Sequence, residues 1–241
     1  MQSSLYVALS GQVALQKRLD TIANNIANMN TGGYRAEEVS FATVLSKSGR
    51  SPTAFATAGD TYVSRRTGEM VSTGNPLDIA VQGDGWFALR TPDGIAYTRD
   101  GRLHMDEGGS LLSVNNYPVL DAGGSSIQID SSAGPPVISQ DGMISQNGVQ
   151  AGAIGLFTID PAARLSRARN SSVIPDIPAS PVLDFTNNGI VQGMAEGSNV
   201  NPVLELTRMI NVSRSFESAS NAIQSTEGSL QDAIKSLGAT S

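Results

Sequence analysis

Residues 5–30 read LYVALSGQVALQKRLDTIANNIANMN, and this stretch decides how the chain can fold. Apolar residues recur alternately three and four positions apart, with Gln12 as the polar interruption, at Leu5, Ala8, Leu15, Leu19, Ile22, Ile26 and Met29. This spacing places them on one narrow seam of an α-helix, as in a coiled coil. We expect the helix to begin at Ser3 or Ser4 and to end near Asn30, before Gly32 and Gly33.

The far end of the chain repeats this spacing. A second helix is predicted to begin at Asn201-Pro202, an N-cap followed by a favoured first helical residue, and to end at Gly238. Its seam consists of Leu206, Met209, Ser213, Phe216, Ser220, Ile223, Glu227, Leu230, Ile234 and Leu237. With a rise of about 1.5 Å per residue, the first helix alone is about 40 Å long, more than a small β domain beside it can cover. We therefore expect the seams to contact other chains.

Four asparagines near the end of the first helix, Asn24, Asn25, Asn28 and Asn30, are poor helix formers beside seam residues. Either their amides hydrogen-bond to neighbouring helices or chains, or the helix end frays. The predicted assembly interface is Leu5, Leu15, Leu19, Ile22, Asn24, Asn25, Ile26, Asn28, Met29, Leu206, Met209, Phe216, Ile223, Leu230, Ile234 and Leu237.

Between the helices the pattern is that of short strands. Leu77, Ile79 and Val81 alternate with polar or small residues, and a tight turn at residues 83–85 leads into the apolar run from Trp86. Glycine-rich turns then recur, with strands expected around Ile127, Val137, Met143, Ile154 to Ile159 and Ile190. This is typical of one all-β domain, a sandwich or partly closed barrel. Residues 34–72 show little alternation and indicate an extended, partly irregular arm.

The predicted class is therefore α+β, with paired, coiled-coil-like terminal helices and a central β domain. We expect four segments: an N-terminal helix in 1–33, a linker arm in 34–72, the β domain in 73–195 and a C-terminal helix in 196–241.

Composition argues against most chemistry. The net charge of −6 and the few scattered basic residues disfavour nucleic acid as a partner. The one basic cluster, Arg164, Arg167 and Arg169, is best explained as a solvated loop. Cysteine is absent, and His104, the single histidine, fits an outward-facing position on a strand. We predict no catalytic residue, no metal site, no cofactor and no small-molecule substrate, and therefore no enzyme.

Three blocks of sequence resemble the flagellar axial proteins. The first covers residues 23–35 (ANNIANMNTGGYR). The second covers 73–87 (TGNPLDIAVQGDGWF) and continues through 97–101 (YTRDG) to 109–111 (GSL). The third covers 196–203 (EGSNVNPV), followed by Met209-Ile210 and Arg214-Ser215-Phe216-Glu217. Asn116 and Asp121 depart from the family pattern, because glycine is common at both positions.

This resemblance implies a non-enzymatic subunit of the bacterial flagellar basal-body rod, with its terminal helices in an inner tube and its β domain outside. The short stretch between Arg35 and Thr73 resembles the proximal-rod protein most, and the distal-rod protein is the alternative. The implied partners are copies of the chain, other proximal and distal rod subunits, and the flagellar export apparatus. The implied location is the periplasm-spanning rod, reached without a cleaved signal peptide, which fits the absence of a basic region and apolar run at residues 1–5.

A cell-wall-binding β module, with the terminal helices forming an ordinary intramolecular hairpin, is the alternative from another functional class. It requires an exposed aromatic platform, and Trp86 is the single tryptophan. Because Trp86 lies within an apolar strand run, we expect it to be packed instead.

Overall fold

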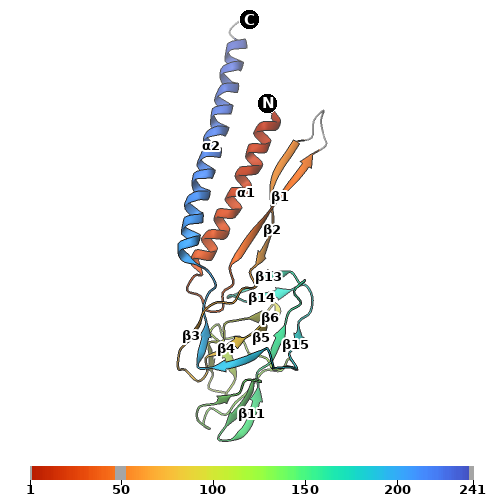
Figure 1. Ribbon diagram of the computed structural model, residues 1–241, viewed down its shortest axis with the longest axis vertical. Coiled ribbons are helices and arrows are strands. Elements are labelled where there is room, and N and C mark those ends of the chain that lie inside the picture. The colour runs from red at the N-terminus through yellow and green to blue at the C-terminus, as the bar shows by residue number, and fades with distance from the viewer. Residues whose placement is uncertain (1, 47–52, 239–241) are drawn as a thin grey trace. The chain divides into compact units, whose positions relative to one another are not determined.

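A computed structural model describes residues 2–46 and 53–238 (Figure 1). The chain divides into two compact units. The helical unit consists of Met1–Ala27, Glu37–Tyr62 and Asn201–Ser241, and the β unit consists of Asn28–Ala36 and Val63–Val200. Both units therefore combine segments that are distant in the sequence.

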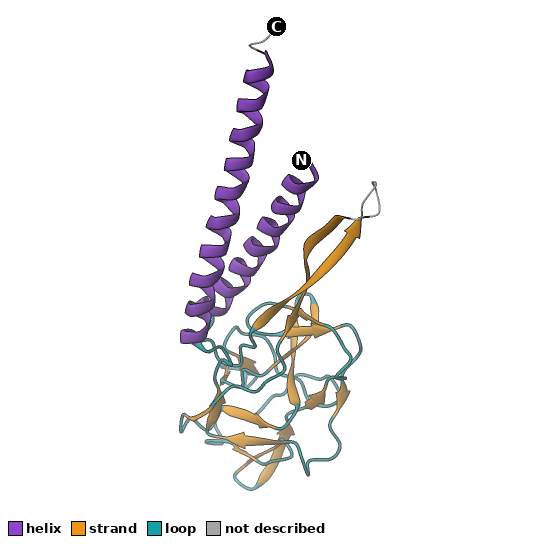
Figure 2. Ribbon diagram, turned by 45° about the horizontal axis from the view of Figure 1, so that its top comes forward, coloured by secondary structure: helices purple, strands orange, loops and turns teal. Residues whose placement is uncertain are grey.

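The helical unit is built on two helices that run in opposite directions along each other, α1 (Gln2–Ala27) and α2 (Pro202–Gly238) (Figure 2). α1 begins at Gln2, so Ser3 and Ser4 lie inside its first turn rather than at its cap. α2 begins where the sequence predicts, because Asn201 Oδ1 accepts a hydrogen bond from the Leu204 N–H at 3.1 Å. In the part of the chain that the structure describes, neither helix has the length and apolar character needed to cross a membrane.

The two helices differ in length. α1 has 26 residues and α2 has 37, which correspond to about 39 Å and 56 Å at the usual rise. Because the end of α1 lies near the start of α2, the last turns of α2 extend beyond the N-terminus of α1 (Figure 1). That extension has no α1 residue opposite it.

The arm predicted for residues 34–72 contains two regular strands, β1 (Glu37–Ser46) and β2 (Thr53–Val63), which form a two-stranded sheet. Across this sheet the Ser40 hydroxyl donates to the carbonyl of Asp60, and the Tyr62 hydroxyl donates to Glu38. The described part of the segment is extended, as predicted, with regular strands in β1 and β2 and an irregular stretch at residues 64–69. The sequence did not predict these strands, because residues 34–72 show little alternation.

The β unit contains the remaining strands. Their bounds are β3 Met70–Ser72, β4 Ile79–Gln82, β5 Gly85–Thr91, β6 Gly94–Thr98, β7 Leu103–Met105, β8 Leu111–Ser113, β9 Val137–Ile138, β10 Met143–Gln146, β11 Val149–Ala153, β12 Leu156–Thr158, β13 Leu165–Arg167, β14 Val173–Pro175, β15 Ser180–Pro181, β16 Gly189–Gln192 and β17 Met194–Glu196. Strands appear at Val137, Met143, Leu156 and Ile190 as predicted. Ile127 makes no strand, although it is buried in the core.

The described strands divide among several small sheets. The largest is antiparallel, with the order β13-β14-β6-β5-β12-β15. In two smaller sheets β4 pairs with β16, and β3 pairs with β17. The tight turn at residues 83–85 joins two strands, as predicted, although β4 and β5 belong to different sheets. These sheets share a core that includes Ile79, Phe87, Leu111, Ile144 and Leu156.

Candidate assembly interface

Several of the described seam residues are covered within one chain. Ile22 is buried, and partial burial is shared by Leu15, Leu19, Ile26, Met209, Phe216 and Ile223. Ala14 of α1 and Val212 of α2, which the heptad assignment passed over, are buried as well. α1 and α2 therefore use much of their apolar surface to pack within the unit.

Other predicted interface residues lie elsewhere. Leu206 is half exposed and Asn24 is exposed. Met29 follows the end of α1 and packs in the β unit against Tyr34 and Val200. The side chains of Leu5, Leu230, Ile234 and Leu237 lie outside the described residues.

Each helix also carries an apolar stripe exposed to solvent. We call the residues on α1, Tyr6, Leu9 and Val13, the α1 stripe; their exposed fractions are 60%, 49% and 62%. On α2 the α2 stripe is Val203, Leu206 and Ile210, with exposed fractions of 74%, 50% and 53%. Of these residues the sequence prediction contained only Leu206. The signal was present as a second set of apolar residues at i, i+3 and i+7 beside the heptad seam.

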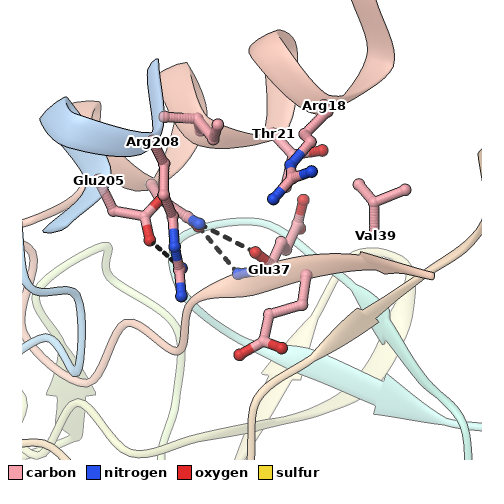
Figure 3. A pocket seen from close by; sticks show the side chains of 9 residues that line it. Arg18, Thr21, Glu37, Val39, Glu205 and Arg208 are labelled. Atoms are coloured by element: carbon pink, nitrogen blue, oxygen red, sulfur yellow. Dashed lines mark hydrogen bonds and ion pairs between the residues drawn. The ribbon is translucent and has the colours of Figure 1, made fainter. Parts of the chain in front are cut away.

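A cavity of about 200 Å³ lies within the helical unit, between the two helices and β1 (Figure 3). It is lined by Arg18, Thr21, Ile22, Asn25, Glu37, Glu38, Val39, Glu205 and Arg208. Asn25 is buried in its wall, where Nδ2 donates to the Glu37 carbonyl at 2.9 Å and Oδ1 accepts from the Glu37 N–H at 2.8 Å. Asn25 thus attaches the start of β1 to α1, because its side-chain amide hydrogen-bonds to a strand of its own chain.

Glu205 is the buried carboxylate of this cavity. Its Oε1 accepts a hydrogen bond from Arg208 Nη1 at 2.6 Å, one turn further along α2. Glu205 also stands in the first turn of the helix, where the helix dipole favours a negative charge. The pair of Glu205 and Arg208 therefore stabilises the start of α2. At the end of α1, Asn28 stabilises the following turn, because its Oδ1 accepts a hydrogen bond from the Thr31 hydroxyl at 3.2 Å.

In the β unit the three sequence blocks meet at one buried carboxylate, Glu196. Arg35 Nη2 lies 2.6 Å from Glu196 Oε1 as an ion pair without hydrogen-bond geometry, and Arg99 Nη1 donates to Glu196 Oε2 at 3.3 Å. The guanidinium carbons of Arg35 and Arg99 stand 5.7 Å and 5.3 Å from the ring centre of Trp86. We call Arg35, Arg99, Glu196 and Trp86 the junction cluster.

Burial changes the pKa values of the two arginines in this cluster. Removal from water lowers the pKa of Arg35 to about 10, and burial lowers the pKa of Arg99 as well, although Glu196 opposes both shifts. Arg99 is held further by its bonds to the carbonyls of Val81 and Gly83. The cluster therefore joins residues 28–36 and the end of the β unit to the sheets.

Backbone contacts complete the junction. The Gly33 N–H donates to the Glu196 carbonyl at 2.8 Å, and Gly33 has a φ of +62°, which favours glycine. Asn199 Oδ1 accepts from the Ala36 N–H at 2.7 Å, and its Nδ2 donates to the carbonyl of Arg66. The burial of Glu196 could not be predicted from the sequence, because it depends on partners far along the chain.

Arg167, the middle residue of the basic cluster, does not lie in a solvated loop, contrary to the prediction. Arg167 belongs to β13, its guanidinium stacks 4.3 Å from the ring centre of Tyr34, and it donates to the carbonyl of Arg35 at 2.6 Å. Arg169 does match the expected solvated position, in an exposed pair with Asp93.

Two other single-residue predictions can be placed. Trp86 is packed, as expected, so it cannot form the exposed platform of a cell-wall-binding module. His104 lies on β7, partly exposed, with Nε2 3.0 Å from Asn116 Oδ1. Asn116 adopts a φ of +61°, in the left-handed region that glycine adopts most readily. Asparagine tolerates this region better than most residues, so the turn is preserved.

Three family models match the chain in order. They are the flagellar basal body rod protein (residues 5–35), the flagellar hook protein FlgE/F/G D1 domain (80–146) and the flagellar basal body rod FlgEFG protein C-terminal region (191–236).

Curated relatives cover the chain end to end. The flagellar basal-body rod protein FlgF of Mesorhizobium japonicum is 50% identical over 100% of both chains. FlgF of Rhizobium meliloti is 45% identical over 99% of both, whereas FlgG of Bacillus subtilis is 32% identical over 97% of this chain and 98% of its own. The chain therefore belongs to the flagellar basal-body rod proteins of the FlgE/F/G family, and within them to the FlgF group.

Proposed function

We propose that this chain, a non-enzymatic subunit of the flagellar basal-body rod, polymerises through α1 and α2 into a hollow shaft that transmits motor torque. In this proposal it occupies the proximal rod and contacts copies of itself and other proximal and distal rod subunits. It reaches the rod unfolded through the flagellar export apparatus, without cleavage of a signal peptide.

The observation that carries the proposal is the apolar surface left uncovered on the helix pair. The α1 stripe and the α2 stripe expose large aliphatic and aromatic side chains to water. A contiguous exposed apolar surface of this kind is typical of an interaction site. The last turns of α2, which extend beyond α1, add a length of helix that a neighbouring subunit can contact.

In this proposal residues in 1–33 and 196–241 supply the helices of the shaft, 73–195 supplies the outer β domain, and 34–72 links the two. Within the linker, Glu37–Tyr62 belongs to the same compact unit as the helices. The buried network of Asn25 and Glu37 supports the proposal, because it holds α1 on β1 before any neighbour is present.

A substitution on the exposed stripe tests the proposal. Leu206→Asp places a charge where half of the side chain already meets water, so the monomer should fold normally. Assembly should fail, because the charge would be buried without a partner in the shaft. The readouts are motility and the amount of the protein in isolated basal bodies, with circular dichroism as the measure of folding.

Ser218→Asp is the matched control, because Ser218 is exposed on α2 outside the stripe. It should preserve motility and incorporation. Leu19→Asp and Ile223→Asp are less direct, because both residues are partly buried within the helical unit. Normal incorporation of Leu206→Asp would contradict assembly through this helix pair.

A further inference from the structure

We propose that the cavity between α1, α2 and β1 binds a small basic amino acid of the lysine type. In this site an ammonium group of the ligand donates to Glu205, and the carboxylate of the ligand is bound by Arg18. The site lies within the helical unit of one chain. It therefore goes beyond the proposed function and needs no neighbouring subunit.

Glu205 supplies the acceptor that the ligand would use. Its side chain lines the cavity and is only 6% exposed. Oε1 accepts from Arg208 Nη1 at 2.6 Å, but within residues 2–46 and 53–238 no hydrogen-bond donor reaches Oε2. A carboxylate oxygen that is withdrawn from water without a donor raises the free energy of the folded chain. A ligand that brings an N–H donor into the cavity removes this cost.

The charges around the cavity favour a ligand with a net positive charge. The carboxylates of its lining outnumber the guanidinium groups by one, and these five residues are Glu37, Glu38, Glu205, Arg18 and Arg208. A metal ion fits poorly, because the described part of the chain contains no group of three or more acidic or histidine side chains placed to hold one. An ammonium group fits better, because its N–H donors need only one or two acceptors at a time.

Arg18 supplies the second contact. It reaches towards the cavity from α1, whereas Glu205 and Arg208 approach it from α2 (Figure 3). A guanidinium group carries several N–H donors, so Arg18 can bind a carboxylate and keep its contacts within the chain. Opposite charges on two walls match a molecule that carries both an ammonium group and a carboxylate.

The size and the apolar lining of the cavity select the side chain of the ligand. Its volume of about 200 Å³ equals roughly seven water molecules at ~30 Å³ each, which is room for an amino acid. Ile22 and Val39 supply apolar surface, against which the methylene groups of a lysine-type chain can pack. Arg18 is exposed and 42% of the Arg208 side chain meets solvent, so these two residues form the entrance.

Titration of L-lysine into the purified full-length protein tests the site, with isothermal titration calorimetry as the measurement. We expect saturable one-to-one binding. Cadaverine has the same chain and both amines but no carboxylate, so it should bind at least about fivefold more weakly. Acetate, which lacks the amine, should not bind. Absence of saturable lysine binding would show that the cavity holds only water, and equal affinity for lysine and cadaverine would remove the role of Arg18. Either result would overturn the inference.

Glu205→Gln tests the acceptor. The neutral amide makes a weaker hydrogen bond with an ammonium group, so the affinity for lysine should fall at least about tenfold. Arg214→Gln is the matched control, because Arg214 is exposed on α2 and does not line the cavity. It should leave the affinity unchanged. Circular dichroism reports whether each variant is folded.

Arg18→Gln keeps the inference testable if Glu205→Gln does not fold, because Arg18 is exposed and its loss should leave the helices intact. The affinity for lysine should fall to that for cadaverine, and the affinity for cadaverine should not fall. Unchanged lysine affinity in either folded variant would overturn the inference. These results are independent of the proposed function, which is tested by incorporation of Leu206→Asp into basal bodies.

Discussion

Glu196 Oε1 lies 2.6 Å from Arg35 Nη2, although the two residues come from opposite ends of the chain. Both side chains are almost completely buried, and Arg99 and Trp86 complete the cluster. Buried charges are costly unless they are paired, so this contact makes the β unit depend on residues beyond its own strands.

Glu196→Gln should destabilise the β unit strongly. The substitution leaves two buried guanidinium groups with no carboxylate, and breaking a buried ion pair on one side costs about 3–5 kcal/mol. Urea unfolding followed by Trp86 fluorescence measures the loss, because Trp86 is the sole tryptophan and stands beside both arginines. Glu107→Gln, at an exposed turn, is the control. An unchanged unfolding midpoint for Glu196→Gln would refute the stabilising role of the cluster.

Gly33→Ala should cost more than Gly74→Ala, although both glycines have a positive φ. A Cβ at Gly33 would collide with the backbone nitrogen of Asp100, whereas a Cβ at Gly74 meets nothing within 4 Å. Gly74→Ala should lose about 1–2 kcal/mol from backbone strain alone, and Gly33→Ala a further 1–3 kcal/mol from the clash. Thermal unfolding compares them, and equal losses would show that the close approach is unimportant.

Asn25→Ala should release the start of β1 from α1. Two hydrogen bonds to the Glu37 backbone are lost, which leaves buried groups unsatisfied at a cost of about 1–3 kcal/mol. Hydrogen exchange at the Glu37 amide is the direct measure and should become much faster. Asn221→Ala, on the exposed face of α2, should leave that amide unchanged. Unaltered protection in Asn25→Ala would contradict the attachment.

Arg167→Lys should destabilise the β unit even though it keeps the charge. Lysine lacks the planar group that stacks on Tyr34 and donates to the Arg35 carbonyl, and the loss should be about 1–2 kcal/mol. Arg169→Lys is the control, since Arg169 forms only an exposed pair with Asp93. Chemical unfolding measures the free energy of unfolding of both variants. Equal values for Arg167→Lys and Arg169→Lys would argue against a stabilising stack of Arg167 on Tyr34.

The helices could be predicted from the sequence because their signals are local. The heptad spacing from Leu15 to Ile26 marks α1, and Asn201-Pro202 marks the start of α2. The burial of Trp86 also followed from its apolar neighbours. Secondary structure of this kind needs information only from residues a few positions away.

The strand pairing and the junction cluster could not be predicted in the same way. A tight turn joins β4 to β5, yet β4 pairs with β16, more than a hundred residues away. Likewise Glu196 reads as a solvated acid until Arg35 and Arg99 are placed around it. The exposed stripes were missed for a different reason, because the heptad assignment records one seam per helix and ignores a second apolar row.

The ion pair between Arg35 and Glu196 also joins an early part of the chain to a late one. A chain that emerges from its N-terminus presents Arg35 early, and its counter-charge arrives only when β17 has appeared. Until then Arg35 and Arg99 remain hydrated, because burying them alone would be too costly. We therefore expect the β unit to complete its folding only after β17 has been made.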